Sequence, residues 1–149
     1  MASHIYIGLD LGSTSLKIAA FDGEAGTVLA QAGAAIPWQR GSTGTCQVPG
    51  SELRLLIIGL LKQVAQRLGA RAADVAAMAS VGHGGGLYVL DAQGALQDDF
   101  AVSSTDQRAT PIANALARLK ARQLFSTVGT GPWSGQPSLI VGIELVDLL

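Results

Sequence analysis

Apolar and polar residues alternate near the start of the chain in two short runs. The first run is Ile5-Tyr6-Ile7-Gly8-Leu9 and the second is Leu16-Lys17-Ile18-Ala19-Ala20-Phe21. Alternation with a period of two is typical of β-strands that bury one face. Gly12-Ser13-Thr14 lies between the runs, and glycine followed by small hydroxyl residues permits a tight turn. The sequence therefore predicts a β-hairpin with a polar turn.

The rest of the pattern predicts a mixture of strands and helices. We expect a third strand over residues 27–34, an irregular segment over 37–50, a helix over 51–68, a strand near 76–81, a short strand over 87–90 and a second helix over 111–125. Apolar residues recur at helical spacing in the first helix, where Ser51 is predicted to cap the N-terminus and Gly69 to close the C-terminus. Three strands followed by a helix and a strand predict the opening of a ribonuclease-H-like α/β domain with a mixed sheet and flanking helices.

Composition and charge narrow the classes of function. The 149 residues are 48% hydrophobic and 14% charged, which is enough to build the core of one ordinary domain. Ten Lys and Arg residues are scattered among 11 Asp and Glu residues, so no basic patch for nucleic acid or anionic lipid stands out. The single Cys46 excludes an internal disulfide and a metal site of several cysteines. Without a signal peptide or a transmembrane run, we expect a cytoplasmic protein with a small-molecule ligand and no nucleic-acid or membrane partner.

The polar residues of the predicted hairpin have the chemistry that a phosphate chain requires. A glycine lets the backbone approach a ligand closely, three consecutive hydroxyls can donate hydrogen bonds, and a lysine supplies positive charge. A carboxylate just before the turn is the hard oxygen ligand that Mg²⁺ prefers. The alternative is an ordinary hairpin with a polar turn. The predicted phosphate-binding residues are Gly12, Ser13, Thr14, Ser15 and Lys17, and the predicted metal ligand is Asp10.

Several segments resemble a known family. Residues 8–17 (Gly-Leu-Asp-Leu-Gly-Ser-Thr-Ser-Leu-Lys) resemble the first phosphate motif of the superfamily of sugar kinases, heat-shock chaperones and actin. Residues 81–91 and 103–108 are similar to the FGGY carbohydrate kinases, with the pentulose branch as the best match, and residues 133–137 resemble L-xylulose kinases. The resemblance implies an actin-like ATPase fold, ATP and Mg²⁺ as cofactors, a sugar substrate, and a full-length form that is compatible with a homodimer.

The resemblance also implies a sugar pocket, although this sequence departs from the family pattern. Xylulokinases tend to have Gln-Met-His where this chain has His83-Gly84-Gly85, and several relatives have tryptophan in place of Ser104. Five of the implied residues have structural alternatives: a turn histidine at 83, turn flexibility alone at Gly84 and Gly85, a packing anchor at Trp133, and a cap of the following helix at Asp106. The implied substrate-binding residues are His83, Gly84, Gly85, Ser104, Asp106, Arg108 and Trp133.

Catalysis is not expected from this chain alone. In FGGY kinases the carboxylate base, the second phosphate-binding element and the adenosine pocket lie further along the chain, which here means beyond Leu149. The resemblance therefore implies that residues 1–149 are the incomplete first lobe of a two-lobed kinase, with no catalytic residue among them. The apolar tail over residues 139–149, which shows no stop signal, agrees with this expectation.

Three alternatives to the kinase interpretation remain. They are an ATPase activator of a dehydratase, a chaperone-like lobe, and a non-catalytic sugar- or nucleotide-binding module. An activator would hold an iron–sulfur cluster on several cysteines, whereas this sequence has only Cys46. The segments over 82–91 and 106–108 argue against the chaperone-like lobe, because their resemblance is to sugar kinases.

Overall fold

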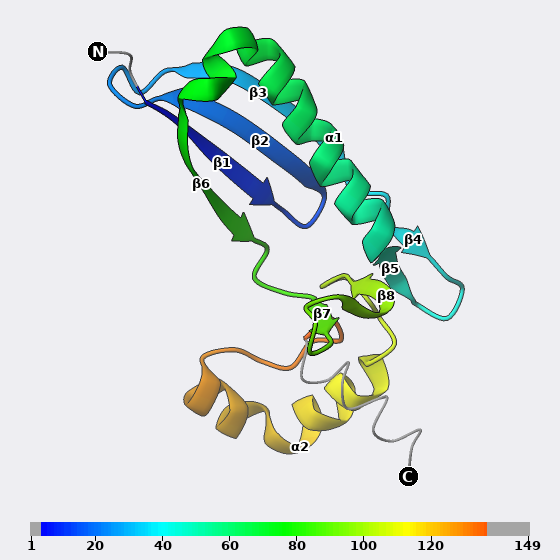
Figure 1. Ribbon diagram of the computed structural model, residues 1–149. Coiled ribbons are helices and arrows are strands. Elements are labelled where there is room, and N and C mark those ends of the chain that lie inside the picture. Colours follow the sequence, from blue (N-terminus) through cyan, green and yellow to red (C-terminus); the bar gives the residue numbers. More distant parts are fainter. Residues whose placement is uncertain (1–3, 137–149) are drawn as a thin grey trace. The chain divides into compact units, whose positions relative to one another are not determined.

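The computed structural model describes residues 4–136, without the side chains at positions 97, 98, 120, 121, 124 and 128. The predicted apolar tail that ends at Leu149 lies outside the described residues, as does Pro137 of the segment 133–137. The chain divides into two compact units. The first unit contains the described residues up to Pro37 together with Ser51–His83, and the second contains Trp38–Gly50 together with the described residues from Gly84 onward. Each unit has its own four-stranded sheet (Figure 1).

The sheet of the first unit is mixed. It contains β1 (Ile5–Leu11), β2 (Ser15–Asp22), β3 (Val28–Ala35) and β6 (Val75–Gly82), in the spatial order β3-β2-β1-β6. Strand β2 is antiparallel to both β1 and β3, and β6 is parallel to β1. Two parallel strands need a long crossover between them, and here it includes the helix α1 (Gly50–Leu68) and a 3₁₀-helix (Gly69–Asp74). The predicted order of three strands, a helix and a strand is therefore confirmed.

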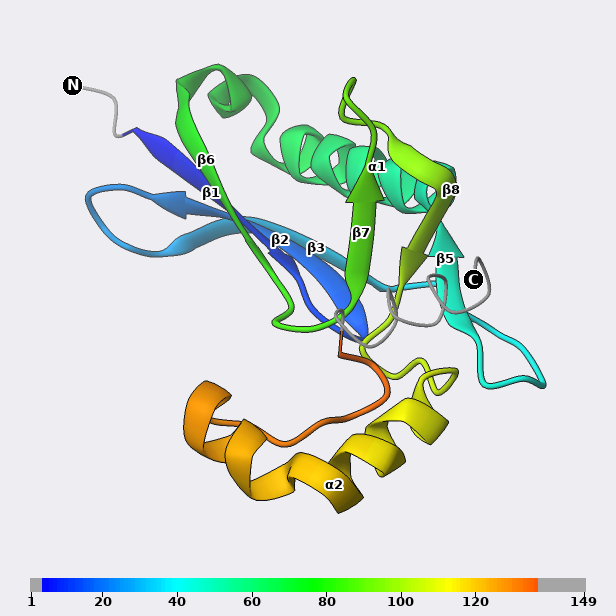
Figure 2. The same ribbon diagram turned by 90° about the horizontal axis from the view of Figure 1, so that it is seen from below.

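Helix α1 covers one face of this sheet (Figure 2). Leu60 and Val64 of the helix belong to one buried cluster with Ile5, Leu16 and Ile18 of the strands. Burying side chains of this size stabilises the folded state by about 1.5–3 kcal/mol each. The helical spacing of apolar residues thus corresponds to the face that packs on the sheet.

The prediction for α1 is wrong at the start of the helix and confirmed at its end. The helix begins at Gly50, so Ser51 lies inside its first turn and the predicted cap at Ser51 is wrong. The helix begins at a close contact, since a Cβ atom on Gly50 would lie 2.2 Å from Cδ1 of Leu96. At the other end Gly69 has a φ of 58°, so the predicted left-handed closure is confirmed.

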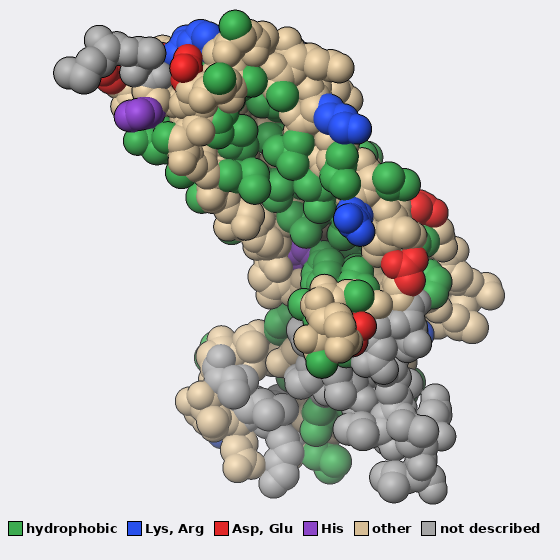
Figure 3. Space-filling view, viewed as in Figure 1, with side chains coloured by type: hydrophobic (Ala, Val, Ile, Leu, Met, Phe, Trp, Pro, Cys, Tyr) green, Lys and Arg blue, Asp and Glu red, His purple; other side chains and the backbone are tan. Residues whose placement is uncertain are grey.

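Strand β6 is an edge of the described sheet. Its residues from Ala76 to Gly82 are exposed, including Met78 and Val81. Beside α1, apolar side chains remain visible on the surface of this unit (Figure 3), and Ile7 and Leu9 of β1 are only partly buried there. The helix therefore covers β2 and β3 more completely than it covers β6.

The sheet of the second unit is antiparallel. It contains β4 (Gln39–Arg40), β5 (Cys46–Pro49), β7 (Leu87–Leu90) and β8 (Leu96–Val102), in the order β4-β5-β8-β7. The prediction of an irregular segment over 37–50 is wrong, because β4 and β5 lie within it. Strand β8 was not predicted either. It carries two adjacent acidic residues, and Asp99 has a φ of 55°, so the strand shows no simple alternation.

The second helix, α2 (Thr110–Val128), confirms the prediction of a helix over 111–125. Its first turn contains Pro111, which is favoured at this position, and it ends at Gly129 with a φ of 73°. Ala109 and Ala113 are buried at its start, whereas Leu119 and Phe125 are exposed. Within residues 4–136, neither this helix nor α1 has the length and apolar character needed to cross a membrane.

Candidate functional site

The turn between β1 and β2 carries the hydroxyl residues of the predicted phosphate motif. The backbone N–H of Gly12 donates a hydrogen bond of 3.0 Å to the carbonyl oxygen of Ser15. The N–H of Ile36 donates one of 3.0 Å to the carbonyl oxygen of Thr14, which fastens the turn to the end of β3. Ser13 and Thr14 are exposed at the tip. Their hydroxyls are therefore presented on a turn that is held from two sides.

Asp10 and Lys17 lie directly opposite each other on β1 and β2. Directly paired residues of an antiparallel ladder point to the same face of the sheet. This face is opposite to the one that α1 covers, because Leu9 and Ile18, the neighbours of Asp10 and Lys17 in sequence, pack into the core. Both charged residues are exposed and line a cavity of about 830 Å³ in the first unit. A cavity of this size lies in the range of small-molecule sites.

A side chain at position 12 would begin close to Asp10. A Cβ atom at position 12 would lie 3.1 Å from the carbonyl oxygen of Ser15 and 3.9 Å from Oδ1 of Asp10. Among the described residues, no three His, Cys, Asp or Glu side chains gather as a metal cluster. Mg²⁺ commonly binds one or two carboxylates and takes its other oxygens from water and substrate phosphates. Asp10 therefore fits a magnesium ion that is shared with a phosphate chain.

His83 directly follows β6 and belongs to the first unit. Its backbone N–H donates a hydrogen bond of 2.9 Å to the carbonyl oxygen of Leu11. Strands β1 and β6 run parallel, with Asp10 paired to Val81, so His83 lies at the sheet edge where both strands end. In open α/β sheets, ligands bind outside the carboxyl ends of the strands. The structure thus brings His83 to the same edge as the β1–β2 turn.

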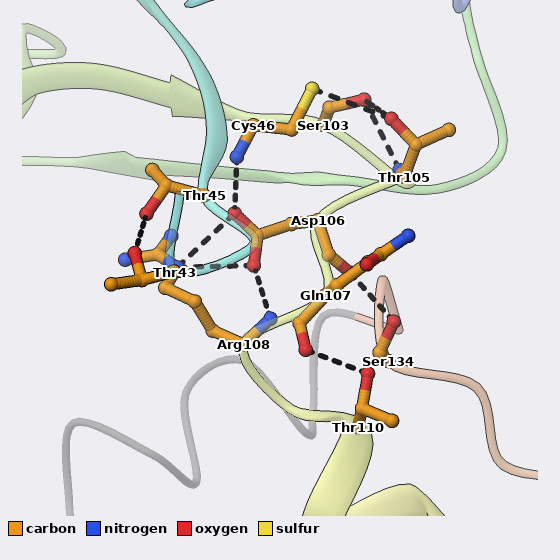
Figure 4. Close-up of polar contacts among 10 residues, drawn as sticks. All are labelled: Thr43, Thr45, Cys46, Ser103, Thr105, Asp106, Gln107, Arg108, Thr110 and Ser134. Atoms are coloured by element: carbon orange, nitrogen blue, oxygen red, sulfur yellow. Dashed lines mark hydrogen bonds and ion pairs between the residues drawn. The ribbon is translucent and has the colours of Figure 1, made fainter. Parts of the chain in front are cut away.

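In the second unit, the carboxylate of Asp106 is fully buried and bonded on several sides (Figure 4). Its Oδ2 accepts a hydrogen bond of 2.8 Å from the backbone N–H of Cys46. Its Oδ1 accepts one of 3.0 Å from the backbone N–H of Arg108. The Arg108 Nε–H donates to both oxygens, and Nε lies 3.0 Å from Oδ1 and 3.1 Å from Oδ2. The carboxylate thus fastens the start of β5 to the segment before α2.

The alternative that Asp106 caps the following helix is wrong. Helix α2 begins at Thr110 after Ala109, and no side chain caps its first turn. The carboxylate is turned away from the helix, towards Cys46 of β5. The backbone N–H and the hydroxyl of Thr110 instead donate to the carbonyl oxygen of Gln107, at 3.1 Å and 2.7 Å.

Two glycines pack directly against Ser104. A Cβ atom on Gly85 would lie 2.8 Å from the Cβ atom of Ser104, and one on Gly135 would lie 1.7 Å from its carbonyl oxygen. The hydroxyl of Ser134 donates a hydrogen bond of 2.7 Å to the carbonyl oxygen of Asp106. The segment around Gly135 is therefore held tightly on the turn that contains Ser104. Trp133, which lies two residues before Gly135, is 39% exposed.

The sequence matches the N-terminal domain of the FGGY family of carbohydrate kinases over residues 5–142. The chain belongs to the FGGY family. It therefore has the α/β fold of an FGGY N-terminal domain, a member of the actin-like ATPase class, and its mixed first sheet agrees with that class. No curated protein matches the sequence.

Solved structures of other kinases share this FGGY fold at low sequence identity. A xyloylose kinase from Brucella ovis is 18% identical, with a TM-score of 0.81 over 97% of this chain and 30% of that protein. A xylulose kinase from Rhodospirillum rubrum is 19% identical, with a TM-score of 0.72 over 89% of this chain and 27% of that protein. A Plasmodium falciparum glycerol kinase with ADP is 12% identical, with a TM-score of 0.75 over 97% of this chain and 29% of that protein. The chain thus spans less than a third of the length of these kinases.

The predicted site residues of this FGGY domain fall into two groups. Those of the first unit meet at one end of its sheet, and those of the second unit lie before β7 and around the segment between β8 and α2. Sequence reasoning missed two partners of Asp106: the backbone N–H of Cys46 and the hydroxyl of Ser134. A backbone donor leaves no signal in the sequence. The first group is Asp10, Gly12, Ser13, Thr14, Ser15, Lys17 and His83, and the second is Gly84, Gly85, Ser104, Asp106, Arg108 and Trp133.

Proposed function

We propose that residues 1–149 are the N-terminal part of an ATP-dependent kinase that transfers the γ-phosphate of ATP to a hydroxyl of a pentulose-like sugar. Membership of the FGGY family supports a sugar phosphotransferase. The observation that carries the proposal is the β1–β2 hairpin, where Asp10 and Lys17 are paired beside the side-chain-free Gly12. Because the chain spans about 30% of the kinases it resembles, we expect the second lobe, the adenosine pocket and the catalytic base beyond Leu149.

The proposed reaction forms one bond to phosphorus and breaks another. The sugar hydroxyl oxygen bonds to the γ-phosphorus, the bond to the β–γ bridging oxygen breaks, ADP leaves, and the hydroxyl proton passes to the base. The hydroxyls of the Gly12–Ser15 turn would donate to phosphate oxygens, and Lys17 would offset their negative charge. Asp10 would hold Mg²⁺, which when bound neutralises part of the phosphate charge. The hairpin would therefore bind and orient the transferred phosphate.

The proposed sugar is a pentulose because the sugar-pocket segments match that branch of the family. Residues 103–108 and 133–137 carry this similarity. Two of the structural neighbours described above are a xyloylose kinase and a xylulose kinase. In the second unit the described parts of these segments lie together, since Ser134 bonds to Asp106 and Gly135 packs on Ser104. This contact supports their assignment to one pocket wall.

A second candidate function is a non-catalytic sugar- or nucleotide-binding module. It is favoured by the glycines at positions 84 and 85 and by Ser104, which lack the larger side chains that relatives have there. Such a module would bind a ligand without transferring phosphate.

The test is phosphotransfer by the product of the complete native gene. ADP release is measured with Mg²⁺-ATP and each of the four ketopentoses, and mass spectrometry identifies the sugar phosphate. We expect one ketopentose to be phosphorylated, and we expect the 149-residue chain alone to give no turnover above the buffer blank. Binding of sugar or ATP without turnover by the complete product would support the module instead, and no binding would overturn both candidates.

A further inference from the structure

The guanidinium of Arg108 is held on one side by a buried charge. Its Nε lies 3.0 and 3.1 Å from the two carboxylate oxygens of Asp106. Asp106 has no exposed surface, whereas the side chain of Arg108 is 29% exposed. Hydrogen bonds between two charged groups are stronger than neutral ones, especially when water is excluded from one partner. The pair therefore fixes the direction of the guanidinium.

This geometry leaves the outer part of the guanidinium for a ligand. Nε is the only nitrogen of the Arg108 side chain that bonds to a described residue, so the two Nη groups have no acceptor within residues 4–136. The positive charge is already balanced by Asp106. An arginine whose charge is balanced in this way is suited to donate hydrogen bonds to neutral oxygens, such as those of a sugar.

We propose that Arg108 binds hydroxyl oxygens of the sugar through its Nη groups and that Asp106 is the positioning residue that fixes its guanidinium. The proposal rests on the proposed function and assigns different roles to the two residues of the Asp106-Gln107-Arg108 triplet. A sugar hydroxyl cannot reach the Asp106 carboxylate without opening the structure, because that carboxylate is buried beneath Cys46 and Arg108.

The test compares Asp106→Asn, Arg108→Ala and the double variant in the complete kinase. Asparagine keeps the shape and one acceptor oxygen but loses the charge that holds Nε. Each single variant should raise KM for the sugar about 10- to 100-fold, and the double variant should raise it no further than the larger single effect. KM for ATP should change less than about threefold. Arg40→Ala is the matched control, because Arg40 is an exposed arginine of the same unit whose guanidinium makes a long bond of 3.4 Å to Thr105.

A second measurement separates positioning from a merely structural role. Arg108→Lys keeps a positive charge but has no Nε to pair with Asp106, so it should fail to restore sugar binding. In nuclear magnetic resonance spectra, the Nε–H of Arg108 should exchange slowly with water in the wild type and quickly in Asp106→Asn. If Asp106→Asn does not fold, Arg108→Lys carries the test of the sugar contact, since it keeps a cation near the buried carboxylate of Asp106 and melting curves check that it folds.

Several results would overturn the inference. If KM for the sugar in Arg108→Ala stays within about twofold of the wild-type value, Arg108 does not contact the sugar. If the two single-variant increases in KM multiply in the double variant, Asp106 does not act through Arg108. These failures differ from failure of the proposed function, in which the wild-type kinase itself turns over no sugar.

Discussion

Replacing Gly12 by alanine tests whether the β1–β2 turn is as tight as the structure indicates. The new Cβ atom would lie 3.1 Å from the carbonyl oxygen of Ser15, which is a backbone atom and cannot rotate away. The turn must open by a few tenths of an ångström, which strains the hydrogen bond of 3.0 Å from Gly12 to Ser15. The methyl group would also stand 3.9 Å from Oδ1 of Asp10, where we place the metal and the phosphate.

The expected cost follows from these contacts. Loss of the turn hydrogen bond costs about 0.5–1.5 kcal/mol, and bending the backbone by several degrees costs about 1 kcal/mol. Replacing glycine by alanine also lowers the conformational entropy of the unfolded chain, which stabilises the folded state by about 0.4–1 kcal/mol. The net loss in the free energy of unfolding is about 1 kcal/mol, or a fall in Tm of roughly 2–4 °C.

Gly8→Ala is the matched control on the same strand. Its Cβ atom would lie 3.6 Å from Cε2 of Phe21, an ordinary van der Waals contact. We therefore expect Tm to stay the same or to rise slightly. Scanning calorimetry of the two variants beside the wild type gives the comparison. Equal shifts in the two variants would refute the reasoning, because they would show that the space around Gly12 is no tighter than that around Gly8.

The remaining predictions concern both units. Gly135→Ala should lower Tm and release the 133–136 segment, because its Cβ atom would overlap the Ser104 carbonyl. Gly131→Ala should do neither, because its Cβ atom would meet nothing within 4 Å. Equal rates of proteolysis at this segment in the two variants would contradict the prediction. Burial raises the pKa of Tyr88 above 10.0. Tyr88 therefore stays protonated to a higher pH in the folded state than in the unfolded state. Its contribution to the free energy of unfolding is fully present below pH 10 and is lost as the pH rises through the pKa of the folded state. Urea titrations should show this loss in the wild type and not in Tyr88→Phe. His83→Ala in the complete kinase should weaken sugar binding by roughly 1–3 kcal/mol at constant ATP affinity, measured by isothermal titration; a lowered Tm with an unchanged sugar Kd would make His83 a structural residue.

Those parts of the fold that depend on local pattern could be predicted from the sequence. Alternation defined β1 and β2, and helical spacing defined α1, because each of these elements buries one face in the same core. Strands β4 and β5 have two and four residues and lie in a segment rich in glycine and threonine. They exist as strands because β5 pairs with β8, about 50 residues further along the chain, and no local signal reports that pairing.

The same division applies to the candidate site. The β1–β2 hairpin that carries the predicted phosphate motif could be predicted because its residues are consecutive and fold against each other. The network around Asp106 could not, because its carboxylate bonds to a backbone N–H 60 residues away. The sequence motif indicated that Asp106 matters but left its role open between a cap and a sugar ligand. Its burial and its bond to Arg108 support the third role that we propose, which is to position the guanidinium of Arg108.

The most direct test of the proposed role of the hairpin is the rate of phosphotransfer by Asp10→Asn in the complete kinase. Asparagine keeps the size of the side chain but removes the charge that would hold Mg²⁺. We predict that kcat falls by about 100-fold or more while KM for the sugar changes less than about threefold. Asp74→Asn is the control, because Asp74 lies outside the hairpin in a partly exposed ion pair of 3.7 Å with Arg71. A near-normal kcat in Asp10→Asn would contradict the account and remove Asp10 from the mechanism.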